Sequence, residues 1–225
     1  MTGASAAAAI YAVARTYLYT DIITHAFEDL AAEALGAPGG TGRGPATHAG
    51  LIYTRAIAAM ESGDTALLPA GQTWPGLIEA ALRRAIDELE HRLGGEMTEW
   101  TWGRIHNTRP RHPLSRVFPE LASCLDPPGV AVGGDADTPQ QGGYSHTERF
   151  AVTLLSVNRY IHDPADWRRS RWIVPLGASG HPGSPHYADQ VDRWAQMQTI
   201  PQLWDWADIQ AAAETQQRLE PNMIS

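Results

Sequence analysis

The pattern of the sequence changes near residue 98, and this change limits the folds that the chain can adopt. Before it, apolar residues recur at helical spacing over residues 4–35 and 73–93. After it, tryptophan, proline and glycine become frequent, and residues 149–161 and 170–177 have the composition of β-strands. Helices that come first and strands that come after, in place of repeated βαβ units, predict an α+β fold.

The clearest predicted helix covers residues 73–93. Thr73 can cap its first turn, Pro75 suits the start of a helix, and the pair Gly94-Gly95 ends it. Its apolar residues are predicted to form one face. They are Leu77, Ile78, Ala81, Leu82, Ala85, Ile86, Leu89 and Leu93.

Three further segments complete the helical prediction. Residues 4–35 are rich in alanine, the best helix former, and are predicted to form one long helix. A second helix is predicted at 47–62 and a short one in the tail. Between the first two lies "GAPGGTGRGP" (36–45), whose glycines are also typical of phosphate loops. No Gly-Lys-Ser/Thr follows and Pro45 blocks the start of a helix, so we interpret this stretch as a connector.

Composition excludes several classes of function. The formal net charge is −8 at pH 7, which argues against binding to nucleic acid. Cys124 is the only cysteine, so no internal disulfide or CxxC zinc site can form, and we expect this thiol to be buried and inert. The N-terminus has no basic region before its alanines, so we expect no signal peptide. Arg15, Asp21 and His25 interrupt it well short of a membrane span, so we expect no membrane partner.

The stretch "GASGHPGSPHYADQ" (177–190) concentrates reactive residue types in one loop. Ser179 would be the nucleophile of a G-x-S-x-G elbow, but the fifth position is His181 and no helix follows. His181, His186 and Asp189 could ligate a metal, but the intervening prolines prevent one helix from presenting them together. We therefore predict neither a nucleophile nor a metal here, and expect the imidazoles to hydrogen-bond backbone carbonyl groups.

The stretch "GGDADT" (133–138) begins like a calcium-binding loop. The positions that should hold a glycine and a bidentate glutamate hold Gln140 and His146 instead. A turn with satisfied carboxylates is the better interpretation. Four tryptophans are predicted to lie in the core rather than to line a pocket: Trp100, Trp102, Trp172 and Trp194.

Several stretches together resemble one family. They are "EWTWGRIHNTRPRHPLS" (99–115), "GGDADT" (133–138), "SVNRYIHDPADWRRSRWIVPLGASGHPGSPHYADQVDRW" (156–194) and "RLEP" (218–221). In order and spacing they resemble the C-terminal part of the penicillin acylases, a family that also includes cephalosporin and acyl-homoserine-lactone acylases. The helical region before them resembles the family more weakly.

This resemblance implies an N-terminal-nucleophile hydrolase with a four-layer αββα fold, in which two stacked antiparallel sheets lie between helical layers. Residues 1–98 would be a helical region, and 99–225 a strand-rich C-terminal region, of one such domain. Enzymes of this family are made as precursors that cut themselves to expose a serine. Its hydroxyl attacks a linear amide and its own α-amine, with a pKa of about 8, is the base. Backbone N–H groups and an asparagine stabilise the oxyanion.

The sequence also departs from the family. No stretch matches the nucleophile, the oxyanion asparagine or the calcium ligands, so the resemblance transfers no catalytic residue and no cofactor to this chain. The chain resembles the later part of a β subunit and would need an upstream acylase portion as its partner. Removal of Met1 would make Thr2 an alternative N-terminal nucleophile, but its surroundings predict a helix, whereas the family's nucleophile opens a strand.

The first hypothesis is therefore the C-terminal portion of an acylase that acts on an acylated amine, with penicillin, cephalosporin and lactone signals all open as substrates. An inactive remnant and a binding module are the alternatives, and the module is disfavoured because its edge strands would lack partners. Family members are typically periplasmic or extracellular. Seven residues are candidates for supporting a site or its substrate pocket, or for plain scaffolding: His106, Asp135, Arg159, Ser179, His181, His186 and Tyr187.

Overall fold

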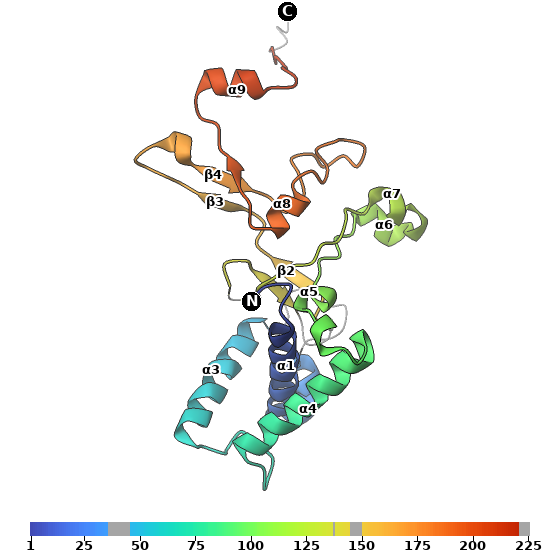
Figure 1. Ribbon diagram of the computed structural model, residues 1–225, viewed down its shortest axis with the longest axis vertical. Coiled ribbons are helices and arrows are strands. Elements are labelled where there is room, and N and C mark those ends of the chain that lie inside the picture. Colours follow the sequence, from blue (N-terminus) through green and yellow to red (C-terminus); the bar gives the residue numbers. More distant parts are fainter. Residues whose placement is uncertain (36–45, 137, 145–149, 221–225) are drawn as a thin grey trace, which may run out of the picture.

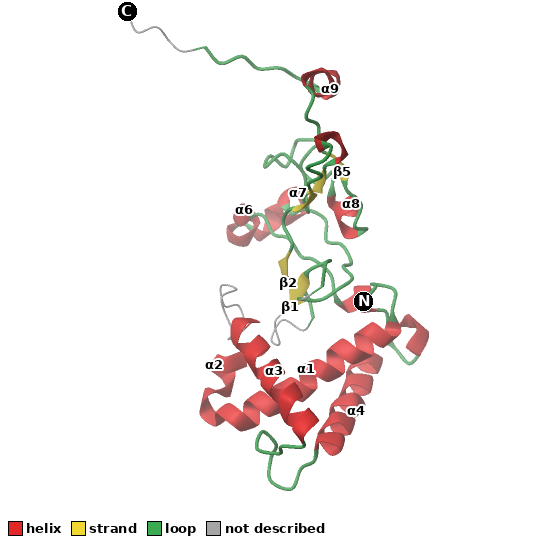
Figure 2. Ribbon diagram, turned by 90° about the vertical axis from the view of Figure 1, so that its left-hand side faces the viewer, coloured by secondary structure: helices red, strands yellow, loops and turns green. Residues whose placement is uncertain are grey.

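A computed structural model describes residues 1–35, 46–136, 138–144 and 150–220 of the protein. The connector predicted at residues 36–45 lies outside these residues. Helices α1 to α4 gather at one end of an elongated molecule, and the strands and the last helix extend away from them (Figures 1 and 2). The described residues thus combine helices with antiparallel strands, which confirms the predicted α+β class.

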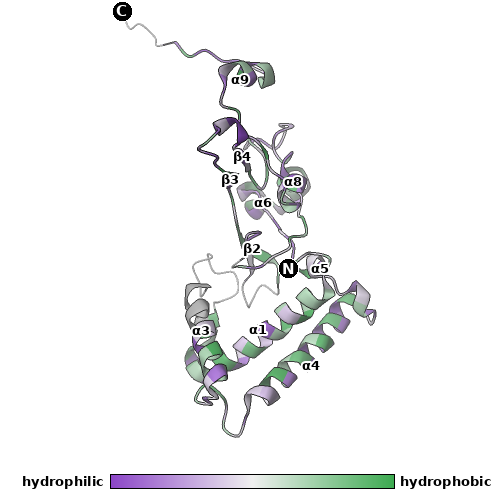
Figure 3. Cartoon of the chain, turned by 60° about the vertical axis from the view of Figure 1, so that its left-hand side comes forward, coloured by the Kyte–Doolittle hydropathy of each residue, from purple (hydrophilic) through white to green (hydrophobic). Residues whose placement is uncertain are grey.

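Helix α1 (Ala6–Phe27) begins where the side chain of Ser5 accepts the N–H of Ala8 at 3.1 Å. Its alanines bury one face and let α4 (Trp74–Leu93) lie alongside it (Figure 3). Among the described helices none combines the length and the apolar character that crossing a bilayer requires.

The prediction of one continuous helix over residues 4–35 is wrong after Phe27. Glu28 has a positive φ of 45°, a 3₁₀ turn covers Glu28–Leu30, and the chain resumes as α2 (Ala31–Leu35). Phe27 and Leu30, which continued the apolar pattern, are 39% and 62% exposed. Because these side chains meet no core, no packing enforces the helix through this point.

Helix α4 confirms the clearest sequence prediction. The side chain of Thr73 accepts the N–H of Gly76 at 3.3 Å, and Gly94 ends the helix with a φ of 92°. Its predicted single apolar face, however, divides into two stripes. The stripe that faces α1 and the helix at residues 46–62 is buried. Ile78, Leu82 and Ile86 form the other stripe and are 37–40% exposed, because no element packs over them in the described residues.

The remaining helices are short, apart from α3 (Ala46–Ser62), which matches the helix predicted at 47–62. Its buried residues Ala56 and Ala59 pack with Tyr19 and Ile22 of α1. The tail helix is also confirmed. The short helices are α5 (Trp102–Ile105), α6 (Pro113–Val117), α7 (Ala122–Leu125), α8 (Val191–Ala195) and α9 (Trp206–Ala212).

The strands of the described residues form two small antiparallel sheets. In the first, Gly142 of one strand lies opposite Leu155 of the other, and in the second, Tyr160 lies opposite Trp172. Sheet order in the second is β3-β4-β5. The strands are β1 (Gly142–Tyr144), β2 (Val152–Leu155), β3 (Arg159–Ile161), β4 (Arg171–Ile173) and β5 (Ile200–Pro201).

The predicted strand at 149–161 is in fact two strands, which belong to different sheets. The chain leaves the first sheet at Ser156, whose carbonyl oxygen accepts the indole N–H of Trp194 at 3.0 Å. The predicted strand at 170–177 is also shorter than expected. It ends at Ile173 because the next N–H, that of Val174, donates to the side chain of Gln190 at 3.2 Å.

Tryptophans organise the core after residue 98. Trp100, Trp102 and Trp194 are buried, which confirms their predicted core positions. Trp172 is only half-buried, because the three-stranded sheet leaves its side chain partly uncovered. Around Trp194 a small separate cluster forms with Val132 and Ile173.

Backbone hydrogen bonds tie the first residues of the chain to the segment after residue 98. The carbonyl oxygen of Gly3 accepts the N–H of Gly103 at 2.7 Å, and that of Met1 accepts the N–H of Gly134 at 3.0 Å. The carbonyl of Ser5 accepts the N–H of Trp102 at 3.2 Å. The start of α1 therefore lies directly against the turn that holds Asp135.

Candidate functional site

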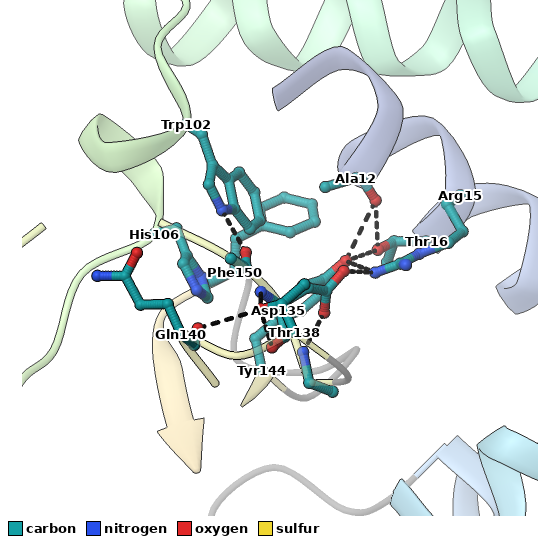
Figure 4. A network of polar contacts seen from close by, with 12 residues as sticks. Ala12, Arg15, Thr16, Trp102, His106, Asp135, Thr138, Gln140, Tyr144 and Phe150 are labelled. Carbon is teal, nitrogen blue, oxygen red and sulfur yellow. Dashed lines mark hydrogen bonds and ion pairs between the residues drawn. The ribbon is translucent and has the colours of Figure 1, made fainter. Parts of the chain in front are cut away.

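A buried ion pair joins helix α1 to the "GGDADT" turn (Figure 4). Asp135 is 7% exposed, and its carboxylate accepts hydrogen bonds from the Arg15 guanidinium and from the N–H of Ala136, the latter at 2.6 Å. The turn requires glycine at 134, where φ is 70° and a Cβ would lie 2.2 Å from the carbonyl oxygen of Gln140. The predicted turn with a satisfied carboxylate is confirmed for Asp135, and Asp137 lies outside the described residues.

Tyr144 at the end of β1 completes this network. Its hydroxyl accepts a hydrogen bond from Arg15 at 3.0 Å and lies 3.1 Å from the hydroxyl of Thr16. Both hydroxyls also reach the carbonyl oxygen of Ala12, at 3.3 Å and 2.8 Å. Helix α1, the turn at Asp135 and strand β1 are thus held by one set of polar contacts.

Electrostatics keep the members of this network in fixed protonation states. Burial alone would lower the pKa of Arg15, but the electrostatic interactions and hydrogen bonds with Tyr144 and Asp135 outweigh it and raise that pKa. Burial raises the pKa of Tyr144, against the opposing charge of Arg15. Arg15 is therefore always charged, and Tyr144 stays a neutral phenol at physiological pH.

His106 lies beside this network and stacks on Trp102, with ring centroids 4.3 Å apart. Its Nδ1 lies 2.8 Å from the carbonyl oxygen of Phe150, so Nδ1 carries the proton. Nε2 faces the backbone of Gly142, where a Cβ would lie 2.9 Å away, and it has no hydrogen-bond partner in the described residues. Burial lowers the pKa of His106, against Phe150, Asp135 and Gly142, which favour the charged form. The ring is neutral, with a buried lone pair on Nε2.

Sequence reasoning missed three members of this network, Arg15, Thr16 and Tyr144. The available signal was a lone arginine within the alanine-rich face of the first helix, where a charge has to find a buried partner. The partner itself could not be deduced, because Asp135 is 120 positions away in the chain.

The loop at 177–190 forms a second group of candidate residues. The imidazole of His186 lies between two carboxylates, with Nδ1 2.8 Å from Asp189 and Nε2 3.1 Å from Glu214. Nδ1 of His181 accepts the N–H of Gly183 at 3.0 Å. The expected hydrogen bonds from these imidazoles to backbone carbonyls are therefore wrong, because acidic side chains and a tight turn supply nearer partners.

Ser179 and Tyr187 shape the same loop. The hydroxyl of Ser179 accepts the N–H of His181 at 3.1 Å, and the hydroxyl of Tyr187 donates to the carbonyl of Leu125 at 2.6 Å. Ring nitrogens of His181 and His186 contact backbone or carboxylate groups, not a hydroxyl. The nearby Cys124 is exposed, which corrects the expected buried thiol, because the short helix α7 lies on the surface.

Arg159 occupies a third place. Its guanidinium lies 4.2 Å from the ring centroid of Trp194 and donates to the side chain of Ser156 and to the carbonyl of Trp194, both at 2.7 Å. Burial lowers the pKa of Arg159.

The candidate residues thus fall into three groups, with only His106 and Asp135 sharing the buried network. Within the described ranges, no group of three His, Cys, Asp or Glu side chains is placed to hold a metal.

The pH response of His186 is a direct test of its surroundings. Hydrogen bonds that His186 donates to Asp189 and then to Glu214 raise the pKa of His186 above its ordinary value of 6.5. The contact with Glu214 therefore contributes fully below that ordinary value and is lost as the pH rises through the raised pKa. We expect an NMR titration of His186 to show the raised pKa, and Glu214→Gln to lower it. Asp192→Asn, which removes a charge outside this contact, should leave the pKa of His186 raised. Equal pKa values of His186 in the unchanged protein and in both variants would contradict the contact.

Comparison with known proteins shows the family to which the sequence of this chain is similar. The family described as "Penicillin amidase" matches residues 1–211. Penicillin acylase 2 proenzyme of Pseudomonas sp. (strain SE83) is 37% identical over 166 residues, which cover 74% of this chain and 20% of that protein. Acyl-homoserine lactone acylase QuiP of Pseudomonas aeruginosa is 29% identical over 142 residues, covering 58% of this chain and 17% of that protein.

The chain spans about a fifth of the length of these relatives. The two stretches that carry most of the resemblance, at 99–115 and 156–194, lie within the matched residues. Since the family pattern covers residues 1–211, well over half of the chain, this chain belongs to the penicillin amidase family.

Proposed function

We propose that the chain is the C-terminal portion of an amidohydrolase that cleaves a linear amide bond and releases a carboxylic acid and an amine. The match to the penicillin amidase family over residues 1–211 carries this proposal. Relatives named as a penicillin acylase and as acyl-homoserine lactone acylases support acyl-amine substrates. The proposed architecture is the four-layer αββα fold of N-terminal-nucleophile hydrolases, to which α1–α4 contribute helices and β1–β5 contribute strands.

The proposal assigns the nucleophile to residues outside this chain. The hydroxyl of Ser179 is occupied by the N–H of His181, and no histidine nitrogen faces it in the described residues. Thr2 lies in a turn just before α1, with its carbonyl oxygen 3.1 Å from the N–H of Ser5, and opens no strand. Ser179 therefore has no adjacent base of the kind that an activated nucleophile needs, and Thr2 does not open a strand as the family's nucleophile does. The proposal likewise assigns no metal or cofactor to this chain and places the calcium of related enzymes on residues outside it.

In this proposal the residues of this chain hold the surroundings of the active site in place. In this proposal the Arg15–Asp135–Tyr144 contacts fix the turn that follows Gly134, and His106 fills the space beneath β1. The 177–190 loop, with Ser179, His181, His186 and Tyr187, would border the substrate pocket, and Arg159 would hold the second sheet through Trp194. The partner is the upstream portion of an acylase.

We expect the purified chain alone to give no measurable hydrolysis of a chromogenic phenylacetyl or long-chain acyl amide. The physical reason is the absence of an activated nucleophile, without which catalysis by covalent attack is lost. Co-expression with the upstream region of an acylase of this family should restore turnover. Thr2→Ala and Ser179→Ala serve as controls, because turnover by the lone chain that either change abolishes would place the nucleophile here and overturn the proposal. Failure to restore turnover would favour an inactive remnant or a binding module.

A further inference from the structure

Aromatic side chains form a row of ring contacts along the segment from β3 to β4 and the segment before α9. These segments lie toward the end of the molecule opposite the helices α1 to α4 (Figure 1). The rings of Tyr160 and His162 stack with centroids 4.5 Å apart, and His162 meets the edge of Trp167 at 6.1 Å. Trp167 then contacts Trp204 at 5.1 Å, with a tilt of 52° between the rings. Trp167 and Trp204 are 47% and 43% exposed, so their indole faces are open to a ligand.

An open pocket of about 470 Å³ lies at these two indoles. It is formed where the turn between β3 and β4 meets the segment that leads into α9. Its lining combines the two indoles with charged side chains of both signs. The lining residues are Ala165, Asp166, Trp167, Arg168, Trp204 and Asp205.

The charges of this pocket are unequally partnered. Arg168 donates to both oxygens of Asp166, at 2.9 Å and 3.2 Å, so these two charges balance each other. Asp205 is the residue before α9, yet its carboxylate does not cap that helix. It makes no hydrogen bond or ion pair with any described residue, but its charge, after the larger effect of Asp166, helps to raise the pKa of Arg168. The pocket thus sets two carboxylates, those of Asp166 and Asp205, against the one guanidinium of Arg168, beside two exposed indole faces.

We propose that this pocket binds an organic ammonium ion, on a small molecule or at the end of a flexible side chain. Indole faces attract cations through the negative potential of the ring, and tryptophan does so best among the aromatic residues. Asp205 supplies the opposite charge, and it repels an anion at the same place. The inference is independent of amide hydrolysis, because it uses no residue of the proposed acylase site.

The experiment compares two ligands of nearly the same shape, choline and its uncharged analogue 3,3-dimethylbutan-1-ol, by calorimetric titration of the protein of residues 1–225. We expect weak binding of choline, with the neutral alcohol at least about fivefold weaker, which is the factor that one exposed cation–π contact supplies. Equal affinity for the two ligands would show an apolar pocket without cation recognition and overturn the proposal, as would no choline binding at all. Tetramethylammonium should bind as choline does, and a requirement for the choline hydroxyl would also contradict it.

Variants locate the binding. Trp204→Ala and Asp205→Asn should each weaken choline binding by about fivefold, from the loss of one cation–π contact or of the opposite charge. Trp206→Ala is the matched control, because Trp206 is 70% exposed and does not line the pocket. Far-UV circular dichroism checks that each variant folds. If Trp204→Ala fails that check, Asp205→Asn still tests the proposal, because it keeps the shape of the side chain. Unchanged affinity in Asp205→Asn, or an equal loss in Trp206→Ala, would place the ligand elsewhere.

Discussion

Replacing Asp135 with alanine is expected to lower the free energy of unfolding by about 3–5 kcal/mol. The change leaves the guanidinium of Arg15 in a largely buried position without its opposite charge, and this uncompensated charge sets the magnitude. Tyr144 would remain as a hydrogen-bond partner, but a neutral phenol does not balance the charge. Urea denaturation followed by circular dichroism measures the loss.

The double variant Arg15→Met/Asp135→Ala separates the ion pair from general disruption of the turn. Removing both charges eliminates the buried unpaired guanidinium, so the double variant should be more stable than Asp135→Ala alone. Glu79→Ala is the matched surface control, because it breaks an ion pair with Arg83 whose side chains are 64% and 75% exposed. A denaturation midpoint in Asp135→Ala no lower than in Glu79→Ala would refute the buried pair.

Replacing Trp194 with alanine is the second large effect that we expect, with a loss of about 3–5 kcal/mol in the free energy of unfolding. Trp194 is fully buried, and its removal leaves a cavity between Val132 and Ile173. It also leaves the carbonyl of Ser156 without its indole donor and the guanidinium of Arg159 without the ring it covers. The exposed Trp206→Ala variant tests the same chemical change without a cavity, and the two variants should differ by most of the expected loss.

Near-UV circular dichroism distinguishes local from global damage in Trp194→Ala. Trp100 and Trp102 pack with α1 and α4 in a cluster separate from that of Trp194, so their near-UV signal and the far-UV signal of the helices should both persist in Trp194→Ala without urea. Loss of both signals in Trp194→Ala without urea would show that the damage spreads from the Trp194 cluster to the helices, and would contradict the separation of the clusters.

Local chemistry made the helices predictable, whereas distant partners decided most of the rest. Thr73 begins α4 and Gly94 ends it, each through a hydrogen bond to a residue only a few positions away. Both end signals could be recognised in the sequence. The single strand predicted at 149–161 failed because Ser156 turns its carbonyl to an indole 38 positions away. Strand β1 gave no signal, since its first residues are glycines that carry no alternating side chains.

The candidate residues illustrate the same limit. His106 and Asp135 were named from their motifs, but Asp135 pairs with Arg15, 120 positions away, and His106 hydrogen-bonds Phe150, 44 positions away. For His186, the second carboxylate comes from Glu214, in a tail where the sequence pattern only predicted a helix. Residue type identified the chemistry available at each position, and tertiary contact decided which partner used it.

The bonds between the first residues of the chain and the segment from Trp102 to Gly134 have a consequence for the order of events during synthesis. A ribosome releases α1 long before it releases Gly134, so the carbonyls of Met1 and Gly3 have no native partner in the nascent chain. Until that segment emerges, α1 can rest only on nearby helices, whose contacts close short loops and form early. Formation of these bonds is therefore a late step, which waits for the N–H of Gly134.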